Sequence, residues 1–247
     1  MIQSVDRAIR ALGLLRSARG SHGLSLAQLA AGLELAPSTV HGIVKTLQAH
    51  GLVVQEPRSG HYRLGPELLK LGNVYLGTLE LRSRSVTWSA ELARRTGFAV
   101  RIGARTAGEV MIVHHEPRPD GSRQMAEVGL TLPLHATALG KAVLAFTGEE
   151  PGELSSMTAD TVTDPAALAG QLDQARARGL ATEQEEAVLG ECGLAAPISD
   201  AESVIGAIGI VVPVAEWPVA DPVTAAVREA ARTISHELGA SGWPAAR

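Results

Sequence analysis

The segment from His135 to Lys141, HATALGK, carries residue types that bind phosphate in other proteins. It ends in Gly-Lys, as a phosphate-binding loop does, but the first glycine of such a loop is missing and Ala142 stands where the loop needs a metal-binding hydroxyl. We therefore reject a nucleotide-binding loop. Thr137 can instead cap a helix over residues 138–146, whose free N–H groups favour an anionic or hydroxyl-rich ligand. These groups belong to Ala138, Leu139 and Gly140, and Lys141 is expected either to assist them or to lie at the surface.

The remaining candidates for catalysis lack the partners that their chemistry needs. The sequence contains no G-x-S-x-G motif, and the acidic run Glu183, Glu185 and Glu186 has no paired histidine. Because most acidic runs form solvated faces, we expect at least two of these three glutamates to be exposed. His114 and His115 are adjacent on an expected strand, so their side chains point to opposite faces and cannot easily share a metal ion. The residues therefore predict no catalytic site, no metal and no cofactor.

Length and composition indicate a two-domain globular protein rather than a membrane or secreted one. The chain has 247 residues, of which 45% are hydrophobic and 19% are charged, and no apolar stretch is long enough to span a bilayer. The first ten residues lack the apolar segment of a signal peptide. Cys192 is the only cysteine, which excludes an internal disulfide and a multi-cysteine zinc site. We expect the protein to reside in the cytoplasm, with no membrane partner.

Charge is distributed unevenly along the chain. The formal net charge is −4, yet residues 1–64 contain seven basic and three acidic residues. The rest of the chain contains 15 basic and 23 acidic residues. A basic N-terminal segment joined to an acidic body is typical of a protein that presents one end to DNA, although the asymmetry alone is a weak signal.

The N-terminal segment has the periodicity of a helix-turn-helix. Apolar residues at helical spacing predict helices over residues 5–17 and 26–33, the second with a capping box that starts at Ser25. After a short turn, Pro37 opens a third helix, which Gly51 ends. In a helix-turn-helix this last helix enters the major groove of DNA. The residues that would face the DNA are Ser38, Thr39, His41, Gly42 and Lys45.

A hairpin is expected after the third helix. Residues 52–55 and 61–64 have the pattern of two strands around a turn-rich tip that carries Arg58, and this hairpin would form the wing of a winged helix. Three packed helices with a hairpin also occur in protein-binding modules, so the pattern alone leaves that alternative open.

The rest of the chain alternates helices with strand pairs, which is typical of an α+β domain. We expect helices over residues 86–96, 165–178 and 222–238 in addition to 138–146. Strands are expected over residues 99–102, 110–114, 193–198 and 204–212. The last pair is the most apolar, so we expect it at the centre of the sheet.

Six segments resemble the IclR family of transcriptional regulators and are spread over nearly the whole chain. They are IQSVDRAIRALGLL, LAPSTVHGIVKTLQAHGLV and GHYRLG in the first part, and LPLHATALGKAVLA, GLATEQEEAVLGECGLAAPISD and IGAIGIVVP in the second. The resemblance implies a winged helix-turn-helix over residues 1–64, a linker helix over 65–81 and an effector-binding domain over 82–247. That domain would be GAF-like, with a central antiparallel sheet. The resemblance also implies homodimers, often paired into homotetramers.

The same resemblance implies which residues line the effector pocket. They are Thr137, Ala138, Leu139, Gly140, Glu183, Gly193, Gly209 and Val211. Members that bind small keto acids have cysteine or serine at the last three positions, whereas this chain has two glycines and a valine there, with Cys192 one residue away. A different or larger effector is therefore expected. Its polar contacts would come from Arg101, His114, Arg118 or Arg123.

These observations predict an effector-responsive regulator that binds double-stranded operator DNA. Many family members have arginine at the position of Gly42, so Lys45 becomes the expected long basic contact, with Arg58 at the wing. The segments HGIVKTLQ, VMIVHHEPRPDGSRQ and LHATALGK are similar to members that control glycerol use, which favours a repressor of a catabolic operon. Its effector would be glycerol or a phosphorylated or carboxylated metabolite. The alternatives are an activator of an aromatic- or organic-acid operon, and a metabolite-converting enzyme with a regulatory DNA-binding domain.

Overall fold

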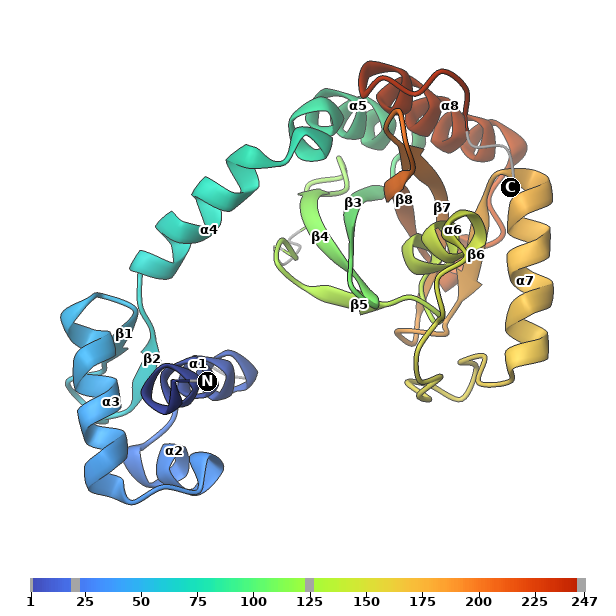
Figure 1. The fold of residues 1–247 in the computed structure, drawn as a ribbon. Coiled ribbons are helices and arrows are strands. Elements are labelled where there is room, and N and C mark those ends of the chain that lie inside the picture. Colours follow the sequence, from blue (N-terminus) through green and yellow to red (C-terminus); the bar gives the residue numbers. More distant parts are fainter. Residues whose placement is uncertain (1, 19–22, 123–126, 244–247) are drawn as a thin grey trace. The chain divides into compact units, whose positions relative to one another are not determined.

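The contacts within the chain divide it into two units, Met1–Thr78 and Leu79–Arg247. The structure is a computed structural model that describes residues 2–18, 23–122 and 127–243. The first unit consists of helices with one small hairpin, and the second of a larger sheet with helices on it (Figure 1). Each unit has its own hydrophobic core, so each is described by itself.

The first unit is a winged helix-turn-helix, as predicted. Its elements are α1 (Gln3–Ser17), α2 (Leu26–Leu33), α3 (Pro37–Ala49), β1 (Val53–Gln55), β2 (Tyr62–Leu64) and α4 (Glu67–Thr78). Compared with the prediction, α1 begins two residues earlier and each wing strand begins one residue later. The helix α4 lies where the linker helix was expected.

Local signals explain where α2 and α3 begin and end. The Ser25 hydroxyl accepts the N–H of Gln28 at 3.2 Å and the Gln28 side chain accepts the N–H of Ser25 at 2.8 Å, which is the predicted capping box. Glu34 ends α2 in the left-handed conformation, and Pro37 starts α3 where no N–H donor is needed. The core that results contains Ala11, Leu15, Leu29, Ala30, Leu33, Val40, Val44, Leu47, Val53 and Tyr62.

The helix α4 is apolar, yet none of its residues is buried. Its side chains Leu69, Leu71 and Val74 are 68%, 57% and 71% exposed, and Tyr75 is also exposed. Leu71, Val74 and Tyr75 are spaced so that they share one face of the helix. A contiguous exposed apolar face of this kind marks an interaction surface.

The second unit is built on an antiparallel sheet that, within the described residues, has six strands in the order β5-β4-β3-β8-β7-β6. The strands are β3 (Ala99–Thr106), β4 (Glu109–Glu116), β5 (Thr131–Pro133), β6 (Ala181–Gln184), β7 (Glu191–Ser199) and β8 (Val204–Pro213). As predicted, β8 is central. Its neighbour β7 is the second strand from the edge, and the edge strand beside it is β6. The sequence pattern did not reveal β6. The edge strand β5 was likewise not predicted.

The helices of this unit lie close to their predicted ranges, with one extension. They are α5 (Glu80–Thr96), α6 (Ala138–Thr147), α7 (Pro165–Arg178), the short 3-10 helix η1 (Val214–Glu216) and α8 (Asp221–Glu237). α5 begins six residues before the predicted start. Thr137 caps α6 as expected, since its hydroxyl accepts the N–H of Gly140 at 3.0 Å.

These helices cover both faces of the sheet (Figure 1). α5 and α8 pack on one face and are joined to each other by hydrogen bonds from Trp88 to Glu237 (2.9 Å) and from Arg95 to Glu229 (2.8 Å). On the other face, every residue of α6 from Ala138 to Ala145 is buried. The fold class is therefore α+β, as predicted. Among the described helices, α6 is the most completely buried.

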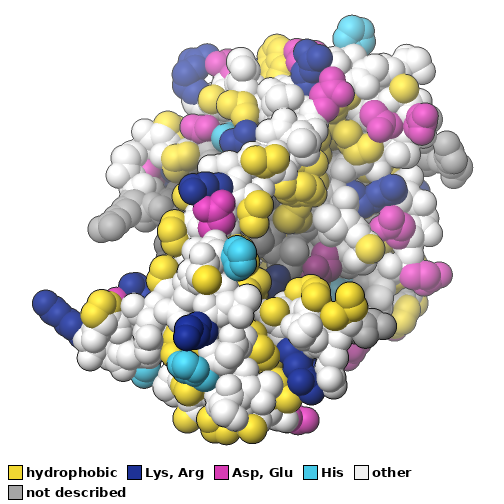
Figure 2. All heavy atoms as spheres, turned by 60° about the vertical axis from the view of Figure 1, so that its left-hand side comes forward, with side chains coloured by type: hydrophobic (Ala, Val, Ile, Leu, Met, Phe, Trp, Pro, Cys, Tyr) yellow, Lys and Arg dark blue, Asp and Glu magenta, His cyan; other side chains and the backbone are white. Residues whose placement is uncertain are grey.

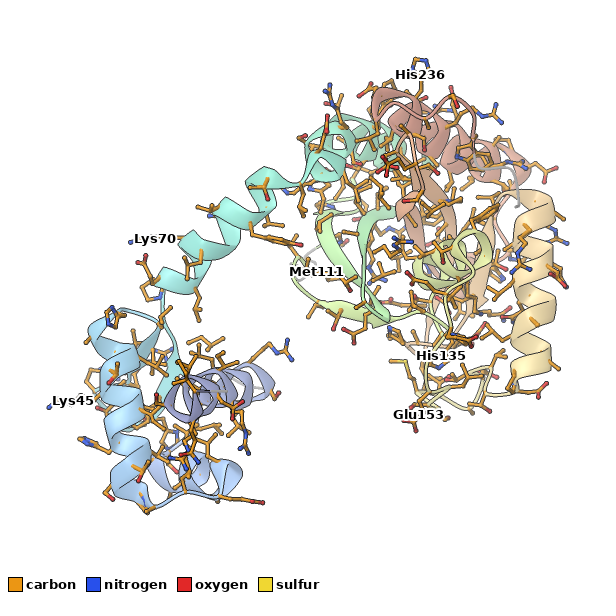
Figure 3. The ribbon with its side chains drawn as sticks, in the orientation of Figure 1. Lys45, Lys70, Met111, His135, Glu153 and His236 are labelled. Atoms are coloured by element: carbon orange, nitrogen blue, oxygen red, sulfur yellow. The ribbon has the colours of Figure 1, made fainter. Side chains whose placement is uncertain are left out.

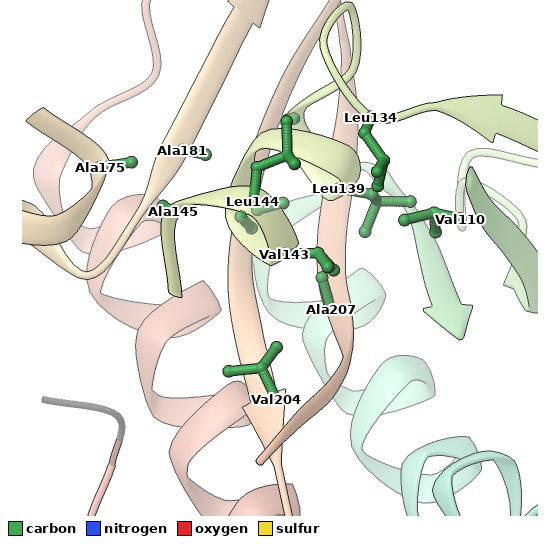
Figure 4. Close-up of a cluster of buried hydrophobic side chains, with 13 residues drawn as sticks. Val110, Leu134, Leu139, Val143, Leu144, Ala145, Ala175, Ala181, Val204 and Ala207 are labelled. Atoms are coloured by element: carbon green, nitrogen blue, oxygen red, sulfur yellow. The ribbon is translucent and has the colours of Figure 1, made fainter. Parts of the chain in front are cut away.

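A cluster of buried apolar side chains fixes α6 on the sheet. In Figure 4, Leu139 of α6 lies next to Val110 of β4, and Val143 lies next to Ala207 of β8. Because both strands pair with β3, this packing determines the direction in which the start of α6 points. The site described below is built around that start.

Candidate functional site

The outward stripe of α3 is exposed along its whole length. Ser38, Thr39, His41, Gly42 and Lys45 are all exposed, opposite the buried Val40, Val44 and Leu47. Figure 3 shows Lys45 extending from α3 away from α1 and α2. A side chain at position 42 would meet open space. The stripe can therefore approach another molecule closely. It presents small or polar side chains together with one long cation, Lys45.

The wing adds a second exposed cation to this unit. Arg58 lies exposed in the turn between β1 and β2, whereas Arg63 of β2 is paired with Glu56 at 2.7 Å. In the view of Figure 2, Lys, Arg and His side chains lie among uncharged ones over the part of this unit that faces the reader. Lys45 and Arg58 thus give this unit two long, exposed cations, the type of side chain that contacts phosphate groups in protein–DNA complexes.

The second unit contains a cavity of about 140 Å³ beside the start of α6. Seven of the eight residues that the resemblance assigns to an effector pocket line it: Thr137, Ala138, Leu139, Glu183, Gly193, Gly209 and Val211. We call this space the Glu183 cavity.

The eighth predicted residue, Gly140, does not line the cavity. Its N–H is already bound by the Thr137 hydroxyl at 3.0 Å, and this hydroxyl in turn donates to the carbonyl of Pro133 at 2.9 Å. A Cβ at position 140 would lie 2.4 Å from the carbonyl oxygen of Leu134. Gly140 therefore serves close packing in this structure, and the helix-start N–H groups left for a ligand are those of Ala138 and Leu139.

Glycine at two strand positions makes room for the cavity wall. A Cβ on Gly193 would lie 2.9 Å from Cβ of Ala138 and 3.0 Å from Oε1 of Glu183. A Cβ on Gly209 would lie 2.8 Å from Cβ of Ala195 and from the carbonyl oxygen of Leu194. A serine or cysteine, which the family resemblance implies at these positions in members that bind small keto acids, would therefore not fit here without movement. Cys192 is buried and pairs with Gln184 in the register, and it is not among the residues that line the cavity.

The acidic run differs from the prediction. Two of its three glutamates, Glu183 and Glu186, are buried, so the expectation of at least two exposed side chains is wrong. Lys141 is only 1% exposed, so the expectation that it lies at the surface is wrong, and its side chain does not line the cavity. The reason is a tertiary ion pair: Lys141 Nζ donates to Glu186 Oε1 at 2.5 Å. The inward alternation of Ala181 and Glu183 in β6 is the signal that could have revealed the buried glutamate.

Burial changes the acid-base properties of this group. It raises the pKa of Glu183 to about 7, helped by the negative charges of Glu186 and Glu191 and opposed by Lys141 and by the N–H that Glu186 donates to Glu183 Oε2 at 3.0 Å. Burial lowers the pKa of Lys141, while Glu186 opposes that change. Near neutral pH the Glu183 carboxyl can therefore both donate and accept hydrogen bonds at the cavity wall.

Of the four candidates for polar contacts, Arg101 lines the cavity. Its guanidinium binds both carboxylate oxygens of Glu127 and lies 3.3 Å from Oε2 of Glu191. Burial alone would lower the pKa of Arg101, but these two carboxylates outweigh it and the net change is upward. Arg101 also forms part of the wall of a second, more open cavity of about 500 Å³, which shares Glu127, Glu191 and Val211 with the first.

The other three candidates are placed differently. Arg118 lines the second cavity, together with His115. His114 lines neither cavity; its Nε2 lies 3.5 Å from Glu116, and burial lowers its pKa. Arg123 lies outside the described residues. Within residues 2–18, 23–122 and 127–243, no group of three or more His, Cys, Asp or Glu side chains is arranged to hold a metal ion.

Two family models together match most of the chain. The model described as "IclR helix-turn-helix domain" matches residues 4–57, and the one described as "Bacterial transcriptional regulator IclR C-terminal" matches residues 73–236. The chain is 45% identical to the glycerol operon regulatory protein of Streptomyces griseus, and 97% of each chain is covered. It is 43% identical to the protein of the same name from Streptomyces coelicolor, again with 97% of each covered.

A solved structure shares the fold over almost the whole chain. The IclR transcriptional regulator from Alicyclobacillus acidocaldarius matches with a TM-score of 0.81 at 22% identity, covering 97% of this chain and 100% of that one. In the described part of the chain, no helix is both long enough and apolar enough to cross a membrane.

Proposed function

The chain belongs to the IclR family of bacterial transcriptional regulators, and we propose that it is a repressor of a glycerol-utilisation operon whose operator binding is controlled by a small molecule in the Glu183 cavity. The protein is a DNA-binding regulator with an effector-binding domain. We propose further that it acts as a repressor in the cytoplasm and that it controls a glycerol operon. The residues assigned below to the operator and effector sites belong to the same proposal.

The single observation that carries the effector site is the convergence of residues on the Glu183 cavity. Residues from α6, β6, β7 and β8 that the family resemblance assigns to the effector pocket meet at one space, although they are far apart in the sequence. This space offers two helix-start N–H groups, the Glu183 carboxyl and the clamped guanidinium of Arg101, which suit a ligand with several hydroxyl or acidic oxygens. The Thr137 hydroxyl is committed to the carbonyl of Pro133 and to the N–H of Gly140, so we propose that this space binds its ligand without chemistry.

The operator site is supported by the exposed face of the first unit. Lys45 and the small side chains of the α3 stripe would enter the major groove, and Arg58 would meet the DNA backbone or the minor groove. The two Streptomyces relatives carry the name of glycerol operon regulators, and this similarity supports glycerol utilisation as the controlled process.

We also propose that the DNA-binding form is a two-fold dimer. The exposed apolar face of α4, with Leu71, Val74 and Tyr75, has no partner among the described residues of the first unit and would be buried against a second copy. Replacing Val74 with Glu should then weaken the dimer and operator binding together. Analytical ultracentrifugation and operator titration of Val74→Glu check this, and an unchanged dimer would contradict it.

The experiment for the regulatory role is a reporter fused to the promoter of the operon beside the gene. Deleting the gene should raise transcription in the absence of glycerol, and the intact gene should permit transcription when glycerol is added. Lower transcription after deletion would indicate an activator. Glycerol-independent transcription in the presence of the intact gene would contradict the assignment to glycerol utilisation.

A further inference from the structure

Lys141 and Glu186 form the most deeply buried ion pair among the described residues. Their side chains are 1% and 5% exposed, and the atoms Lys141 Nζ and Glu186 Oε1 are 2.5 Å apart. Removing two charges from water is costly, and apolar side chains of similar volume often stabilise a protein equally well. The fold alone therefore gives little reason for a charged pair at this place.

The pair is connected to the Glu183 cavity by a short chain of hydrogen bonds. The backbone N–H of Glu186 donates to Glu183 Oε2 at 3.0 Å. Glu186 is held in place by the Thr161 hydroxyl, which donates to its carbonyl oxygen at 2.6 Å, and by the N–H of Val162, which lies 3.4 Å from Oε2. Lys141 is the fourth residue of α6, in the turn that begins with Ala138 and Leu139 of the cavity wall.

We propose that Lys141 is a positioning residue of the effector site: through its ion pair with Glu186 it holds Glu183 at the cavity wall and sets the charge of that carboxyl, so that effector binding depends on pH. The proposal rests on the proposed function of the cavity. Lys141 does not touch the ligand space and acts only through Glu186 and Glu183.

The charges around Glu183 give the direction of this effect. Glu186 and Glu191 disfavour a second negative charge, Lys141 favours it, and burial raises the pKa of Glu183 to about 7. Arg101 and Glu127 line the same cavity, and Cys192 is packed near the carboxyl from β7. Without the Lys141 ammonium, Glu183 would keep its proton to higher pH. Without both Lys141 and Glu186, the two opposing influences are lost together and the titration should stay close to that of the wild type.

The test is a pH titration of the full-length protein labelled with ¹³C at the glutamate side-chain carboxyl and observed by NMR. The resonance of Glu183 is identified by its loss in Glu183→Gln. In Lys141→Met its midpoint should move upward by about one pH unit or more, as expected for the loss of a neighbouring opposite charge. In the double variant Lys141→Met with Glu186→Gln, the midpoint should return toward the wild-type value.

The outcomes separate this inference from the proposed function. An unchanged midpoint in Lys141→Met would overturn it, as would a double variant shifted as far as the single one. Thermal unfolding measures the stability of both variants separately. If Lys141→Met does not fold, the wild type is compared with the double variant and with Glu186→Gln instead. In Glu186→Gln the midpoint of Glu183 should lie at lower pH than in the wild type. The titration uses no effector. If the cavity were not the effector site, the midpoints would still shift, while variants that block the cavity would keep their effector response.

Discussion

Glu183 of β6 lies directly opposite Gly193 of β7 in the antiparallel register, and only the missing side chain of Gly193 leaves space for its carboxyl. A Cβ at position 193 would lie 3.0 Å from Glu183 Oε1. We predict that Gly193→Val fills the cavity, so that reporter transcription no longer responds to glycerol while repression persists. A response equal to that of the wild type would show that this wall does not contact the effector.

The raised pKa of Glu183 predicts a pH-dependent stability. In the unfolded chain the carboxyl has its ordinary pKa, whereas burial raises it to about 7 in the folded protein. Between these values the folded state holds a proton that the unfolded state releases, so this group's contribution to the free energy of unfolding is full at low pH and falls as pH rises through about 7. The total loss would be on the order of 3 kcal/mol.

Urea unfolding of Glu183→Gln as a function of pH measures this loss. The variant should gain stability relative to the wild type as pH rises from about 5 to above 7, and then the difference should level off. Glu153→Gln, which makes the same substitution at an exposed glutamate, is the control measured over the same pH range. Parallel pH curves for Glu183→Gln and the wild type would contradict the raised pKa.

Two helical glycines should respond in opposite ways to alanine. In Gly140→Ala the new Cβ would lie 2.4 Å from a backbone oxygen of Leu134, which should cost about 1–3 kcal/mol of stability. In Gly170→Ala the new Cβ meets nothing within 4 Å on the exposed side of α7, and this change should stabilise the protein by about 0.5–1 kcal/mol. Denaturant unfolding measures the stability of both variants. A Gly140→Ala variant as stable as the wild type would mean that the start of α6 can move.

The winged helix-turn-helix and much of the sheet could be predicted because their signals are local. Helical spacing, the Ser25 capping box and the Thr137 cap each depend on residues within one or two turns. The strands β5 and β6 are only three and four residues long, and β6 contains three polar residues in a row, so their sequences alone have no clear strand pattern.

The candidate site was predictable in its parts but not in its electrostatics. The resemblance named the residues of the cavity wall, whereas the ion pair of Lys141 with Glu186 joins residues 45 positions apart. No local pattern shows that a lysine within a helix and a glutamate after a short strand will be buried together. For the same reason, the clamp of Arg101 by Glu127 and Glu191 appears only in the folded chain.

The open space at Gly42 predicts a gain of DNA affinity. Gly42→Arg would add a long cation to the α3 stripe without a clash, and should strengthen binding to non-specific DNA. The fall of the DNA-binding constant with salt concentration should become steeper, by about one released counterion per recognition helix. Arg58→Ala should do the reverse and weaken all sequences similarly. Fluorescence anisotropy with operator and random DNA at several salt concentrations measures both. A change of sequence preference in Arg58→Ala without general weakening would show that Arg58 reads bases.

The most direct test of effector control is operator binding measured by anisotropy while glycerol or glycerol 3-phosphate is added, for the wild type and for Val211→Trp. Val211 lines both cavities, so tryptophan there should block them, and a thermal unfolding curve of the variant is the check that it folds. We predict that one of the two compounds lowers wild-type operator affinity about fivefold or more, which corresponds to about 1 kcal/mol of coupling, and leaves Val211→Trp unchanged. A response of Val211→Trp equal to that of the wild type, or no response of the wild type to either compound, would contradict the account.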